Sequence, residues 1–127
     1  MASFIFNVTF DCADPGSLGR FWSEVTGYEL VEERDDLVRL KAPDKRGVRH
    51  ILFVQVPEPK ATKNRVHIDI RVAGEPPWDM RAREVLIRAK SAELADAGAV
   101  IVREESWDGQ LSHIIMLDPE GNEFCVA

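Results

Sequence analysis

The sequence predicts an α+β fold: two βαβββ modules forming a curved mixed sheet around a central cavity, with the helices on its outer face. Three observations predict it. Segments with the two-residue apolar period of strands are interrupted by two segments with a helical period. The order strand, helix, three strands occurs twice along the chain. Asn7-Val8-Thr9-Phe10 and His67-Ile68-Asp69-Ile70 begin the two repeats at matching places.

The first repeat opens with a strand over 4–12, where apolar and polar residues alternate. Asp14-Pro15 then supplies a helix N-cap and a proline for the first turn, and Gly27 fits a left-handed C-cap. Between them, one helix face is apolar: Leu18, Phe21, Trp22, Val25. Three more strands are expected at 28–33, 37–42 and 50–56.

The second repeat begins with a strand over 65–72, whose polar face carries Arg65, His67, Asp69 and Arg71. A helix is predicted over 80–97, ended by Gly98, with a less regular apolar stripe: Val85, Leu86, Ala89, Leu94, Ala97. Strands follow at 99–104, 111–117 and 122–127. Trp107-Asp108-Gly109-Gln110 and Asp118-Pro119-Glu120-Gly121 are turns between them.

Length and composition predict one globular domain over 1–127, with module one at 1–59 and module two at 60–127. The chain is 45% hydrophobic and 30% charged, which is ordinary for a folded domain. A net charge of −6 argues against nucleic-acid binding and against anionic membrane surfaces. No apolar run reaches the ~20 residues of a membrane span, and the first residues lack a signal-peptide pattern. We therefore expect a cytoplasmic protein with Cys12 and Cys125 as reduced thiols.

Three segments carry a family resemblance. The first runs over 11–27 and includes Asp14-Pro15 and Phe21-Trp22; the second runs from Val56-Pro57-Glu58 to His67-Ile68-Asp69. The third and most specific is Asp118-Pro119-Glu120-Gly121-Asn122 before a final strand. In this order they resemble the glyoxalase-like branch of the vicinal oxygen chelate superfamily, which includes glyoxalases, bleomycin-resistance proteins and dioxygenases. The resemblance implies paired modules around a cavity, and commonly a homodimer, but no single reaction.

The resemblance also implies where a metal would be held, on the first and last strands of each module. These places fall on Asn7, on Val54 or Gln55, on His67 and on Cys125, of which only His67 is the expected residue. His67, Cys125 and Glu123 are therefore the candidate metal ligands, and Asp69 or His113 are further ones. The usual set is incomplete, so the sequence leaves a divalent metal cofactor open.

The candidate ligand-binding residues are His67, Asp69, Asn7, Arg65, Trp107 and Cys125. Four of them have a structural alternative. His67 is either a cavity residue or a sheet histidine satisfied by Asp69, and Arg65 either orients an anion or lies in a solvated ion pair. Trp107 and Trp78 either cap the cavity or contact a second subunit. Cys125 is either a nucleophile or, as we favour, a small buried thiol.

Three functions are compatible with these residues, and the sequence does not decide whether the protein is an enzyme. The first is binding of a small polar or anionic molecule in the sheet cavity, without a metal. The alternative is a metal-dependent lyase, isomerase or dioxygenase with a displaced ligand set centred on His67. The third is an interaction module with a vestigial cavity.

Overall fold

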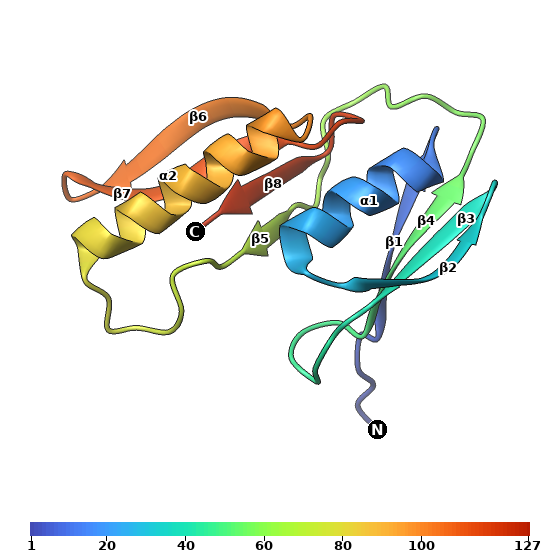
Figure 1. Cartoon of the computed structure of the whole chain (residues 1–127), viewed down its shortest axis with the longest axis horizontal. Coiled ribbons are helices and arrows are strands. Elements are labelled where there is room, and N and C mark those ends of the chain that lie inside the picture. The colour runs from blue at the N-terminus through green and yellow to red at the C-terminus, as the bar shows by residue number, and fades with distance from the viewer. The chain divides into compact units, whose positions relative to one another are not determined.

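The computed structural model describes residues 1–127 as two compact units, Met1–Ala61 and Thr62–Ala127 (Figure 1). Each unit has one helix and one four-stranded mixed sheet, and each follows the order strand, helix, three strands. This confirms the α+β class and the two βαβββ modules. The arrangement of both modules as one domain around a shared cavity stays a prediction.

The first unit contains β1 (Asn7–Cys12), α1 (Pro15–Thr26), β2 (Glu29–Arg34), β3 (Leu37–Lys41) and β4 (His50–Gln55). Its sheet has the order β1-β4-β3-β2, in which only β1 and β4 run parallel. The strand β1 is shorter than expected, because residues before Asn7 form no ladder with β4.

The helix α1 begins and ends where the sequence predicts. The Asp14 side chain accepts a hydrogen bond from the Ser17 backbone N–H at 3.1 Å, and Gly27 adopts the left-handed conformation with φ of 73°. The helix lies close to the sheet at Gly19, where an added Cβ would come within 2.6 Å of Val38 Cγ1. The apolar faces of helix and sheet therefore meet without a side chain at this position.

The second unit contains β5 (Ile68–Ile70), α2 (Met80–Asp96), β6 (Val100–Trp107), β7 (Gln110–Leu117) and β8 (Glu123–Val126). Its sheet has the order β5-β8-β7-β6, in which only β5 and β8 run parallel. The two-residue turn between β6 and β7 uses Asp108 and Gly109, both at positive φ, as an Asp-Gly hairpin requires.

Two expectations for this unit are wrong. The strand predicted over 65–72 is only three residues long, because its single partner β8 has four residues and ladder pairs exist only from Ile68 to Ile70. Val66 is consequently exposed instead of sharing an apolar face with Ile68.

The apolar stripe predicted for α2 is also wrong, except at Leu94, which is buried. The helix buries Arg83, Ile87, Ser91 and Leu94, whereas Val85 and Leu86 are exposed. At 3.6 residues per turn, positions 85, 86 and 89 fall on the side away from positions 83, 87 and 91. The face that packs against β7, β6 and β8 is therefore the less apolar one, which contains an arginine and a serine.

The turn before β8 is built around a buried carboxylate. Asp118 is almost fully buried, and its Oδ1 accepts hydrogen bonds from the backbone N–H groups of Glu120 and Asn122, each at 2.9 Å. The Asn122 side-chain amide donates to the same carboxylate. The Asp-Pro-Glu-Gly-Asn motif therefore fixes how the chain enters β8, which carries Cys125.

Neither helix of the protein has the length and apolar content needed to cross a membrane.

Candidate functional site

The second unit has a cleft of about 570 Å³, whose lining includes His67, Asp69, Cys125, His113 and Arg83. Two of these residues come from the face of the sheet that α2 does not cover. In the parallel pairing of β5 with β8, Asp69 lies beside Cys125 on this open face. On the opposite face Ile68 lies beside Phe124, which is fully buried. The alternation of strand residues therefore separates the apolar core from the polar cleft.

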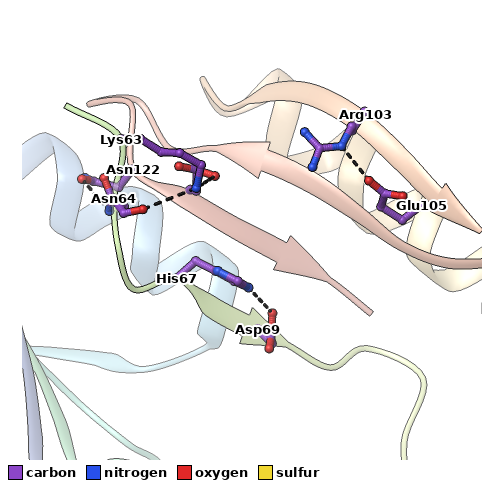
Figure 2. A network of polar contacts seen from close by, with 8 residues as sticks. Lys63, Asn64, His67, Asp69, Arg103, Glu105 and Asn122 are labelled. Atoms are coloured by element: carbon purple, nitrogen blue, oxygen red, sulfur yellow. Dashed lines mark hydrogen bonds and ion pairs between the residues drawn. The ribbon is translucent and has the colours of Figure 1, made fainter.

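The polar groups of His67, Asp69 and Cys125 converge within the cleft. His67 precedes β5 by one residue, and its Nε2 lies 3.3 Å from Asp69 Oδ1 (Figure 2). The Cys125 thiol lies beside the same carboxylate, because β5 and β8 pair Asp69 with Cys125. One nitrogen, one oxygen and one sulfur ligand atom thus lie within 4.8 Å of one another. This set suits a borderline-soft divalent ion such as Zn²⁺, which takes nitrogen, oxygen and sulfur ligands.

The Cys125 thiol is held in its protonated form. Burial first, and then the nearby Asp69 carboxylate and the Glu123 charge, together raise its pKa from the ordinary 9.0 to about 11. Arg103 opposes the shift. At neutral pH the group is therefore a neutral thiol and a poor nucleophile, as the buried-thiol interpretation expects.

Glu123 forms an ion pair with a residue outside the group of three. Its Oε2 forms an ion pair with Lys63 Nζ at 3.0 Å, and Asn64 donates a weak side-chain hydrogen bond to Asn122 at 3.4 Å. These contacts tie the segment before β5 to the start of β8 (Figure 2). Lys63 and Asn64 therefore have a structural role at the edge of the site.

The remaining candidates are not members of this group of three. Asn7 opens β1 in the first unit, where its Oδ1 is buried without a hydrogen-bond partner. Arg65 is exposed, and Trp107 is 80% exposed at the end of β6. His113 lines the cleft, with Nδ1 at 2.9 Å from Ser112 Oγ.

Arg83 is the cleft residue that the sequence reasoning missed. It is 7% exposed, and its guanidinium donates hydrogen bonds to the carbonyl oxygens of Leu111 and Ser112. A signal was present, because Arg83, Ile87 and Ser91 recur every four residues on one helix face. That stripe contains only one apolar residue in three, so hydrophobicity alone favours the opposite stripe of the helix.

Comparison with known proteins identifies the family. Residues 7–127 match the family described as glyoxalase-like domain. The chain belongs to the glyoxalase-like domain family. The resemblance seen in the sequence is thereby confirmed. No curated protein matches the sequence of this glyoxalase-like domain.

Solved structures share the fold at low sequence identity. A glyoxalase-related enzyme from Fulvimarina pelagi is 14% identical with a TM-score of 0.72, covering 99% of this chain and 88% of its own. A glyoxalase/bleomycin resistance protein/dioxygenase family enzyme from Burkholderia phytofirmans PsJN is 16% identical with a TM-score of 0.72, covering 98% and 97%. A fosfomycin resistance protein from Listeria monocytogenes, complexed with Mn(II) and dihydroxypropylphosphonic acid, is 12% identical with a TM-score of 0.70, covering 99% and 90%. These likenesses place the glyoxalase-like domain in the vicinal oxygen chelate fold.

Proposed function

We propose that this glyoxalase-like domain binds a small polar or anionic molecule in the cleft of its second unit. The observation that carries the proposal is the convergence of His67, Asp69 and Cys125 in a hollow of about 570 Å³. This volume is within the range of small-molecule sites, roughly 300 to 1,000 Å³. A cleft of this size and polarity also argues against a vestigial cavity.

The three groups give the cleft both donors and acceptors. Asp69 presents a carboxylate that is exposed on one side, and half of the His67 side chain is accessible. An imidazole can donate from one ring nitrogen and accept at the other, so it suits a ligand with hydroxyl or carbonyl groups. The neutral Cys125 thiol adds a small, weakly polar surface at the floor.

A fragment screen by ¹⁵N–¹H NMR tests this function. We expect small polar and anionic fragments to shift the amide signals of β5, β8 and the 71–79 segment. His67→Gln and Asp69→Asn should weaken these fragments by about 2- to 10-fold, the effect of one lost hydrogen bond. His50→Gln, a histidine of the first unit, is the matched control. Fragment shifts confined to other regions, or cleft shifts unaffected by both variants, would contradict the proposal.

A metal-dependent lyase, isomerase or dioxygenase is the second candidate, and the three-ligand group favours it. His67, Asp69 and Cys125 would hold a divalent ion and leave a coordination position open. Such an ion would supply a Lewis acid that polarises a ligand oxygen. The neighbour holding Mn(II) and a phosphonic acid supports this only by analogy of fold.

Metal titration separates the two candidates. If the group is a metal centre, Zn²⁺, Mn²⁺, Ni²⁺ or Fe²⁺ should raise the melting temperature, and His67→Ala should abolish the rise while His50→Ala should not. The affinity should increase with pH, because the Cys125 thiol must lose its proton to bind. If none of these ions raises the melting temperature, metal-free binding of a small molecule is the function that remains.

The homodimer and the cytoplasmic location stay predictions from the family resemblance and the sequence. Light scattering on the purified chain measures the first, and the mass of a single chain of 14.3 kDa would contradict it.

A further inference from the structure

Arg83 brings a buried positive charge to the wall of the cleft. It lies in the first turns of α2 and is 7% exposed. Its Nη1 donates to Leu111 O at 2.8 Å, and its Nη2 donates to Ser112 O at 2.6 Å. Both acceptors are uncharged backbone carbonyls of β7.

The charge of Arg83 has no counter-charge in the protein. No carboxylate forms an ion pair with it, and its Nε–H is buried without a hydrogen-bond partner. The nearby N-cap Asp79 is occupied by the backbone N–H groups of Arg81 and Ala82. A buried guanidinium without a counter-charge is unfavourable, since burial removes water without replacing it by an anion.

The surroundings keep Arg83 in place beside the cleft. Its guanidinium carbon lies 4.9 Å from the centre of the Trp78 ring, and Trp78 is fixed by a 2.9 Å hydrogen bond from its indole N–H to Gly74 O. The guanidinium carbon of Arg71 also lies near this ring, 5.6 Å from its centre. Arg71, however, forms an ion pair with Glu75, in which Nη1 lies 2.9 Å from Oε2. Arg83 is therefore a cationic side chain of the cleft wall that has no carboxylate partner.

We propose that Arg83 is the anchor for an oxyanion, a carboxylate or a phosphate-like group, carried by the molecule that binds in this cleft. The inference rests on the proposed binding function and names its ligand class. The planar guanidinium suits both groups, because each terminal nitrogen carries a second N–H that can donate to an oxyanion. His67 and Asp69, on the same cleft, would then contact the uncharged part of the ligand.

Binding of simple anions tests the anchor. Inorganic phosphate, benzoate and its neutral counterpart benzamide are titrated into the full chain and followed by ¹⁵N–¹H NMR, including the Trp78 indole signal. We expect benzoate to bind at least ~10-fold more tightly than benzamide, because a charge-assisted hydrogen bond exceeds a neutral one. Arg83→Met should weaken the binding of phosphate and benzoate at least ~10-fold, and Arg83→Lys should keep part of the affinity.

The matched control is Arg81→Met, which removes an exposed arginine from the same helix turn and should leave anion binding unchanged. Equal binding of benzoate and benzamide by the natural chain overturns the inference, and this comparison holds even if Arg83→Met does not fold. Anion shifts located in the first unit overturn it as well. If neutral fragments bind the cleft and anions do not, the binding function stands and the anchor fails; if no molecule binds there, the binding function itself fails.

Discussion

Cys125 provides the sharpest measurable consequence of the site geometry. Its pKa of about 11, against an ordinary 9.0, results from burial first and then from the Asp69 carboxylate beside it. Near pH 8, an ordinary thiol of this kind is about one tenth thiolate, whereas Cys125 should be about one thousandth thiolate. Because the thiolate is the reacting form, alkylation should be about 100-fold slower than the ordinary value predicts.

The assay is the rate of iodoacetamide alkylation as a function of pH, measured by mass spectrometry. It uses a Cys12→Ala background, so that only Cys125 reacts. The midpoint of the pH profile should lie near 11, and it does not depend on how well the reagent reaches the sulfur. Asp69→Asn should lower the midpoint, because it removes the neighbouring negative charge. Asp108→Asn, in the exposed turn after β6, is the control and should not.

The same shift has a consequence for stability. The folded chain holds the thiol proton more tightly than the unfolded chain, so this contribution is complete below pH 9 and is lost as pH rises through about 11. Its upper limit is about 2 to 3 kcal/mol. Urea unfolding of the natural chain and of Cys125→Ala across this interval measures the difference.

An alkylation midpoint at or below 9 would refute the raised pKa of Cys125 and restore this residue as a candidate nucleophile.

Three further predictions concern the elements that position the site. Asp118→Ala should lower the free energy of unfolding by about 2 to 4 kcal/mol, because several part-buried N–H donors lose their buried acceptor; an effect below ~1 kcal/mol in chemical denaturation would be inconsistent with this. Gly19→Ala should cost about 1 to 3 kcal/mol through the contact with Val38, seen as a lower melting temperature, and an unchanged melting temperature would contradict the close helix–sheet approach. On α2, Ile87→Ala should cost about 2 to 5 kcal/mol and Val85→Ala less than ~1 kcal/mol, and the reverse order in urea unfolding would return the buried face to the stripe predicted from sequence.

The predictions that succeeded depend on local chemistry. Asp14, Pro15 and Gly27 specify both ends of α1, because capping involves only neighbouring backbone groups. Asp108-Gly109 specifies the β6–β7 hairpin in the same way. Alternation likewise places His67 and Asp69 on one side of the chain, since strand residues two apart share a face.

The predictions that failed depend on partners far away in the sequence. The length of β5 is set by β8, which lies more than fifty residues later, and the buried face of α2 is set by the strands beneath it. The ion pair of Glu123 with Lys63 also joins residues distant in the sequence, and no pattern in the sequence specifies which lysine reaches Glu123.

The sequence by itself determined the succession of strands and helices, the family, and the polar face of the chain that carries His67 and Asp69. Only the tertiary structure decided that Cys125 lies beside Asp69, that its thiol stays protonated, and that Arg83 is buried at the cleft without a counter-charge. The physical reason is the separation along the sequence of the residues that interact. Caps, turns and alternation involve residues only a few positions apart. Burial and the meeting of charges depend instead on strand pairing and helix packing between residues distant in the chain.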